Sequence, residues 1–102
     1  MSRMAKIQQM LQADPNDVFL NFSLAMEFAK EGQADEAVRQ FARVTELDPN
    51  HVSAYYQQAN ALVGLDRDTD ARQVLERGVE AARRAGDGHM VDKMSQMLGL
   101  LK

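Results

Sequence analysis

Residues 14–50 read DPNDVFLNFSLAMEFAKEGQADEAVRQFARVTELDPN, a stretch that begins and ends with the same tripeptide. Asp14-Pro15-Asn16 at its start recurs as Asp48-Pro49-Asn50 at its end. Each proline ring pushes the aspartate before it out of helical geometry, so both tripeptides are expected to separate helices. The stretch therefore predicts a repeating unit of about 34 residues.

Small and apolar residues follow the same interval. Small residues match small ones, and large apolar residues match large ones, in four further pairs: Ala25 and Ala59, Phe28 and Leu62, Ala37 and Ala71, Phe41 and Leu75. Chance would rarely align so many pairs at one period. We expect the four alanines to lie where antiparallel helices approach closely, and the larger residues to fill the space between stacked helix pairs.

Between the two tripeptides the apolar pattern is helical. Apolar residues recur at steps of three and four from Phe22 to Ala29, and again from Ala34 to Val44 after the turn at Gly32-Gln33. No stretch shows the strict alternation of a half-buried strand. We therefore expect one all-α domain of about six antiparallel helices, near 3–13, 17–31, 34–47, 51–64, 68–85 and 88–101.

A 34-residue period of helix–turn–helix units resembles the tetratricopeptide repeat. In residues 18–51 the characteristic positions of that family hold Leu24, Ala25, Phe28, Ala37, Phe41 and Pro49. Gly32 lies where the family places the glycine between its two helices, and only Asn21 departs from the pattern. The resemblance implies a short right-handed α-solenoid, a non-enzymatic scaffold that binds protein partners without a cofactor.

The rest of the chain resembles the family less closely. In residues 52–85 the matching residues are Tyr55, Ala59, Leu62, Ala71 and Leu75. Gln58 replaces the usual leucine, Asp66 the glycine and Arg83 the final proline. Residues 3–17 resemble the second half of a preceding repeat, and residues 88–101 are expected to cap the stack with an apolar stripe that includes Met94. The resemblance thus covers essentially all of the single domain predicted for 1–102.

Composition excludes several classes of function. The net charge is −3, and the 12 basic residues are spread among 15 acidic ones, which argues against a nucleic-acid partner. Without cysteine the chain has no disulfide, thiolate metal site or thiol nucleophile. No apolar run approaches the roughly 18 residues of a membrane-spanning helix, and the N-terminus shows no signal peptide. The expected location is cytoplasmic.

No set of residues predicts catalysis or metal binding. His51 and His89 begin predicted helices, and neither has a second ligand at metal-site spacing. The segment 66–70, DRDTD, resembles the acidic start of a calcium loop, but the glycine and glutamate that should follow are missing. We expect Asp68 or Thr69 to cap a helix there instead. The sequence predicts neither an enzyme nor a cofactor or metal site.

The family resemblance also implies a binding surface. In tetratricopeptide proteins the first helix of each repeat lines a concave groove, and the corresponding residues here include Phe19, Phe22, Met26, Lys30, Ser53, Tyr56, Gln57, Asn60 and Val63. Ser23, Ala29 and Gly64 complete the set. Phe22 and Met26 replace the lysine and asparagine with which some members hold a carboxylate, so the predicted groove is apolar and aromatic.

Three occupants of this groove remain open from the sequence. A partner's extended or helical segment could lie in it, held by apolar side chains. A second copy of the chain could bury it, which would give a homodimer. The chain's own terminal helix could also fold back and fill it. An exposed apolar patch of this kind usually marks a contact site.

Overall fold

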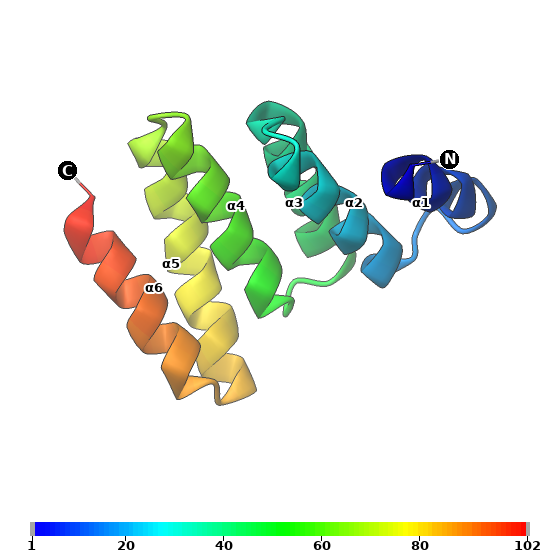
Figure 1. Cartoon of the computed structure of the whole chain (residues 1–102). Coiled ribbons are helices and arrows are strands. Elements are labelled where there is room, and N and C mark those ends of the chain that lie inside the picture. The colour runs from blue at the N-terminus through cyan, green and yellow to red at the C-terminus, as the bar shows by residue number, and fades with distance from the viewer. Residues whose placement is uncertain (1, 102) are drawn as a thin grey trace.

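The computed structural model describes residues 2–101; the predicted domain limits Met1 and Lys102 lie outside this range. The described residues form six α-helices without a strand, as predicted. The helices are α1 (Arg3–Ala13), α2 (Val18–Lys30), α3 (Ala34–Leu47), α4 (Val52–Gly64), α5 (Asp68–Ala85) and α6 (Gly88–Leu100) (Figure 1). Each predicted helix limit falls within one residue of the observed one.

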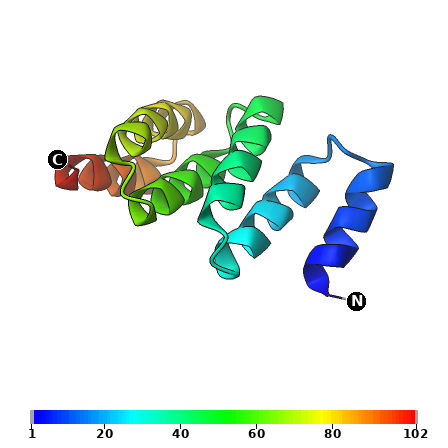
Figure 2. The same ribbon diagram turned by 90° about the horizontal axis from the view of Figure 1, so that it is seen from above.

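The helices stack in chain order. Each packs mainly against the helices next to it in sequence, so the molecule extends along one direction from α1 to α6 (Figure 2). It measures 41 × 29 × 18 Å along its principal axes. This is the arrangement expected of a short solenoid, in which each unit buries its apolar face against its neighbours.

The small residues lie where the repeat predicts them. Ala25, Ala37, Ala59 and Ala71 are all fully buried. Around them the core forms two clusters, one where α2 and α3 meet and one shared by α4, α5 and α6. Phe41 fills the first cluster, and Leu75 and Met94 fill the second. Met94 thus fixes α6 on the stack.

Two polar residues at apolar family positions are buried and hydrogen-bonded. The Asn21 side chain donates to the backbone carbonyls of Pro15 at 3.0 Å and Asp17 at 2.8 Å, and its Oδ1 accepts from Gln40 Nε2 at 2.6 Å. Gln58 Nε2 donates to the Val38 carbonyl at 3.2 Å. These contacts offset the cost of burying each amide, so the departures from the family pattern are accommodated.

The turns inside the two repeats have the same backbone shape. Gly32 adopts a φ of 77°, and Asp66, its equivalent in the next repeat, adopts a φ of 59°.

The prediction that Asp68 or Thr69 caps the next helix is wrong, because α5 already begins at Asp68 and its cap position is Arg67. Asp68 and Asp70 lie in the first helical turn, where a carboxylate favours the positive end of the helix dipole.

Candidate functional site

The predicted groove residues lie on two helices. Phe19, Phe22, Ser23, Met26, Ala29 and Lys30 belong to α2, and Ser53, Tyr56, Gln57, Asn60, Val63 and Gly64 belong to α4. They are exposed or half-buried to different degrees. The Phe19 side chain is the most open large apolar group on α2, with 73% of its surface exposed. The Asp17 carboxylate fixes the start of this helix by accepting from the Leu20 amide at 2.8 Å.

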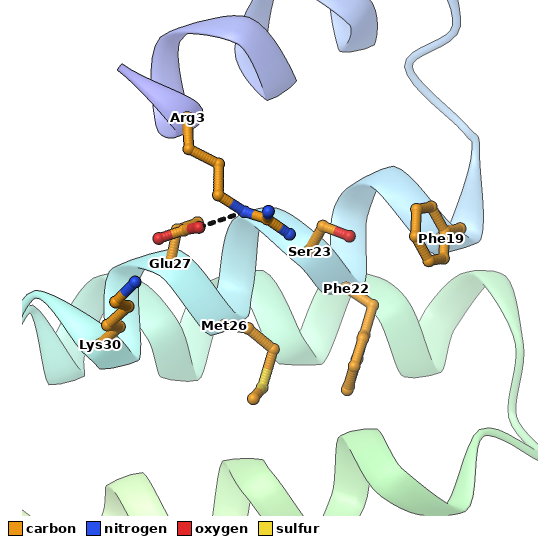
Figure 3. Close-up of a pocket in the computed structure, with 7 residues that line it drawn as sticks. All are labelled: Arg3, Phe19, Phe22, Ser23, Met26, Glu27 and Lys30. Carbon is orange, nitrogen blue, oxygen red and sulfur yellow. Dashed lines mark ion pairs between the residues drawn. The ribbon is translucent and has the colours of Figure 1, made fainter.

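A hollow of about 570 Å³ brings five of the six α2 residues together. It is lined by Arg3, Phe19, Phe22, Ser23, Met26, Glu27 and Lys30, and we call it the α2 hollow. Phe22 and Met26 project from one side of α2, while Arg3 extends from α1 towards Glu27 on the other side of the helix (Figure 3). Apart from this arginine, the lining comes from one helix and is mainly apolar, which suits an apolar segment of a partner.

The α4 residues are not part of this hollow. We call these residues of α4 the α4 patch; Lys93 of α6 places its Nζ 4.7 Å from the centre of the Tyr56 ring there. A hydrogen bond with the Asn60 side chain, and then the Lys93 ammonium, lower the pKa of the Tyr56 hydroxyl below its ordinary value. The α2 hollow thus contains only the α2 part of the predicted groove, and the residues of the α4 part are the more polar of the two sets.

The sequence did not predict an ion pair in the α2 hollow. Arg3 Nε lies 2.5 Å from Glu27 Oε1, and the Glu27 side chain is largely buried whereas Arg3 is exposed. Glu27 is the only charged residue between Val18 and Ala29. Its isolation in an apolar run could have indicated that its carboxylate has a cationic partner. Its partner belongs to another helix and is distant in sequence, so only the packing of α1 against α2 identifies it.

Phe22 links the α2 hollow to the core. Its ring centroid lies 5.8 Å from that of Phe41, which is fully buried, and 4.7 Å from that of His51. His51 also caps α4, because its Nδ1 accepts from the Ala54 amide at 3.2 Å. The sequence predicted only that a helix begins at this histidine. Phe22 therefore has a structural contact as well as a predicted binding role.

The terminal helix does not fill the α2 hollow. Its apolar residues Met90, Met94, Met97 and Leu98 pack into the cluster of α4 and α5, and no residue of α6 lines the hollow. Within residues 2–101 no group of histidine and acidic residues is arranged to hold a metal ion. No helix in that range has the length and apolar character needed to cross a bilayer.

Sequence comparison identifies the family. Residues 28–91, more than half of the chain, match the sequence model of the tetratricopeptide repeat. The chain belongs to the tetratricopeptide repeat family. The predicted resemblance is therefore confirmed. A comparison with curated protein sequences found no match.

Solved tetratricopeptide structures share the fold. A repeat domain protein from Salinibacter ruber is 32% identical, with a TM-score of 0.76 over 83% of this chain and 86% of that one. The TPR2B domain of yeast Sti1, solved as a complex with pHsp70, is 22% identical, with a TM-score of 0.85 over 93% and 76%. The type III secretion chaperone SycD of Yersinia enterocolitica, in complex with a peptide of the translocator YopD, is 18% identical, with a TM-score of 0.85 over 94% and 74%.

Proposed function

We propose that this tetratricopeptide repeat chain is a non-enzymatic interaction module that holds an apolar segment of a protein partner on α2 and α4. The partner's apolar side chains enter the α2 hollow, and its backbone or polar groups contact the patch around Tyr56. Tetratricopeptide repeats are in general interaction modules without catalysis, which agrees with the absence of a catalytic motif in the sequence.

The observation that carries this proposal is the exposure of large apolar side chains on α2. Phe19 is 73% exposed and Met26 is 36% exposed, and both border the same hollow. Burying apolar surface contributes about 25 cal/mol per Å², so a partner segment that covers both side chains gains affinity from their removal from water. The flexible Met26 side chain also adapts to anchors of different shape.

The relatives support the same type of partner. The TPR2B domain of Sti1 was solved with pHsp70, and SycD with a peptide of YopD. Both share the stacking of helices with this chain at low identity, so they support a peptide or protein partner in general and do not identify one. The residues that contact it are therefore proposed from the α2 hollow and the α4 patch alone.

The experiment is affinity capture from the native cell with the wild-type protein and two variants. Met26→Glu places a charge in the α2 hollow, and Tyr56→Ala removes the aromatic ring of the α4 patch. Met26 is exposed, so Met26→Glu should leave the fold intact. Tyr56 is half-buried against the core of α4 and α5, so circular dichroism must show that Tyr56→Ala keeps its helices. Phe22 is unsuitable for this test because it packs against Phe41.

Gln73→Glu serves as the control, since it adds the same charge at an exposed site on α5. We expect the wild type and Gln73→Glu to retain a common partner that Met26→Glu loses. Equal capture by all the variants would contradict the proposed site. Light scattering on the same samples tests the alternative, a homodimer: a dimer that Met26→Glu converts to a monomer would assign the hollow to a second copy.

A further inference from the structure

A second hollow lies at the N-terminal end of the stack, between α1 and α2. It has a volume of about 240 Å³ and is lined by Arg3, Lys6, Ile7, Met10, Phe19, Leu20 and Ser23. We call it the N-terminal edge. It adjoins the α2 hollow at Arg3, Phe19 and Ser23, but four of its seven residues belong to α1, outside the predicted groove.

The repeat register shows that this edge exposes a face that is buried elsewhere. Met10 is 49% exposed, whereas its equivalents in the two later repeats, Val44 and Gly78, are both buried. In α5 that face lies against both neighbouring helices, because a Cβ at Gly78 would meet Tyr55 of the preceding α4 and Met94 of the following α6. In α3, Val44 clusters with Ala25 of the preceding α2 and Ala54 of the following α4. Among the described residues α1 packs mainly on the following helix α2, so the corresponding face of α1 is open at Met10, on the side where a preceding helix would pack.

The basic charges at the N-terminal edge favour a helix with acidic side chains. Arg3 and Lys6 line the hollow and no acidic residue does, although the chain as a whole carries a net charge of −3. Arg3 occupies the register position of the fully buried Ala37 and Ala71, so a helix packing there cannot approach as closely as α2 approaches α3. It must instead offer a carboxylate to the basic side chains. Because Arg3 already pairs with Glu27, Lys6 supplies the larger part of this preference.

The opposite end of a second copy does not fit this surface. The outer side of α6 carries the exposed polar residues His89, Asp92, Ser95 and Gln96, with Leu100 at its end as the exposed large apolar residue of this helix. Such a largely polar face is typical of a terminal helix that faces solvent, and a single leucine at its end is no apolar stripe for Met10 and Phe19. A copy docked through its own N-terminal edge would bring Arg3 and Lys6 to a surface of the same sign.

We propose that the N-terminal edge binds an acidic amphipathic helix of a partner protein. Its apolar stripe covers the exposed side chains of Met10 and Phe19, and its carboxylates pair with Arg3 and Lys6. The helix extends the solenoid by one element at the end of the stack. This site goes beyond the proposed groove, because it depends on α1 and requires no contact with α4.

Two synthetic helical peptides test the proposal. Each has about 18 residues, enough for a helix to form on binding, with the same stripe of leucines. One carries glutamates beside the stripe, and the other carries lysines at the same places. Fluorescence anisotropy of the labelled peptides against the full chain should show binding of the glutamate peptide about tenfold tighter than that of the lysine peptide. Equal affinities, or no binding of either peptide, would overturn the proposal.

Variants assign the binding to the edge. Lys6→Glu should reduce or reverse the preference between the two peptides, and Met10→Glu should abolish binding of the glutamate peptide. Gln8→Glu adds the same charge at an exposed position on the other side of α1 and should change the affinity little. Circular dichroism checks that each variant keeps its helices. If Gln8→Glu weakened binding as much as Met10→Glu, the edge would not be the site.

Two further measurements separate this site from the proposed groove and from a dimer interface. Met26→Glu and Tyr56→Ala, which alter the proposed groove, should leave binding of the glutamate peptide within about twofold, since neither residue lines the edge. Loss of binding in Tyr56→Ala would assign the peptide to the groove instead. Sedimentation equilibrium should find a monomer; a dimer that Met10→Glu dissociates would assign the edge to a second copy and overturn the proposal.

Discussion

The Met94 side chain of α6 lies directly over Gly78 of α5. A Cβ added to Gly78 would come within 2.7 Å of Met94 Sδ and 2.8 Å of Tyr55 Cβ. Real Cβ atoms do not approach other atoms so closely, so a glycine here allows α4 and α6 to pack tightly on α5. Met94 is fully buried at this crossing.

Gly78→Ala should therefore destabilise the protein, although alanine is the better helix former. The gain in helix propensity is about 1 kcal/mol, whereas overpacking costs typically about 1–3 kcal/mol. Met94 is flexible and can move, but the Tyr55 Cβ is fixed to its backbone, so overpacking wins. Urea denaturation should give a lower free energy of unfolding than for the wild type.

Gly99→Ala is the control for Gly78→Ala, because a Cβ at Gly99 meets nothing within 4 Å. It should leave stability unchanged or slightly raised. Met94→Ala should lower the free energy of unfolding less in the Gly78→Ala background than in the wild type, since it removes one of the two clashes. A more stable Gly78→Ala protein would show that α5 and α6 separate easily.

Asp66→Gly should stabilise the protein. Asp66 holds a φ of 59°, a left-handed conformation that costs an ordinary L-residue about 1–2 kcal/mol and an aspartate somewhat less. Glycine adopts it without strain but loses more entropy on folding, so the expected net gain is up to about 1 kcal/mol. The reciprocal change Gly32→Asp, at the equivalent turn, should lower the melting temperature. A lower melting temperature for Asp66→Gly would refute the strain at this turn.

Ala37→Leu should overpack the crossing of α2 and α3. Ala37 is fully buried beside Ala25 and Phe41, and the extra side-chain atoms should cost about 1–3 kcal/mol. Ala29→Leu, at an exposed position of α2, is the matched control and should have little effect. Thermal melts that do not distinguish the two variants would contradict the close approach of these helices.

The Tyr56 hydroxyl should ionise below its ordinary pKa of 10.0. Asn60→Ala should raise this pKa most, and Lys93→Gln should also raise it, because both side chains favour the phenolate. A depressed pKa in the folded state contributes stability that is present above the unfolded value and is lost as the pH falls through the folded value. NMR titration of labelled tyrosine measures the shift, with Lys6→Gln as the control. An unchanged pKa in Asn60→Ala would contradict the assigned cause.

Removal of residues 88–102 tests the predicted capping role of the terminal helix. The deletion uncovers Tyr55 and Val79, which pack in one cluster with Met94. The shortened chain should melt at a lower temperature and bind a dye for exposed apolar surface. Melting at the wild-type temperature would mean that α6 contributes nothing to the stack.

The sequence alone predicted the number of helices, their limits and their order. The two Asp-Pro-Asn tripeptides, the 34-residue period and the helical spacing are local or periodic patterns in the sequence. They can therefore be recognised without knowledge of tertiary contacts. The buried alanines followed from the same register. The period could not predict how Asn21 and Gln58 are accommodated, because their partners Gln40 and Val38 are fixed by helix packing.

The side-chain contacts around the proposed binding surface could not be predicted from the sequence. The period and the family pattern assigned residues to α2 and α4, but they could not show that Arg3 and Glu27 meet, that Lys93 covers Tyr56, or that Phe22 packs on His51. Each of these pairs joins different elements of the stack, and its geometry depends on crossing angles and side-chain volumes throughout the molecule.

The opening stretch, residues 14–50, determined by itself that this protein is a repeat of antiparallel helices, because short-range rules fix where helices begin and end. Only the tertiary structure decided that Phe19, Phe22 and Met26 line one hollow with Arg3 and that α1 leaves Met10 exposed. Exposure is a property of the whole stack, since whether a side chain meets water depends on what its neighbours cover.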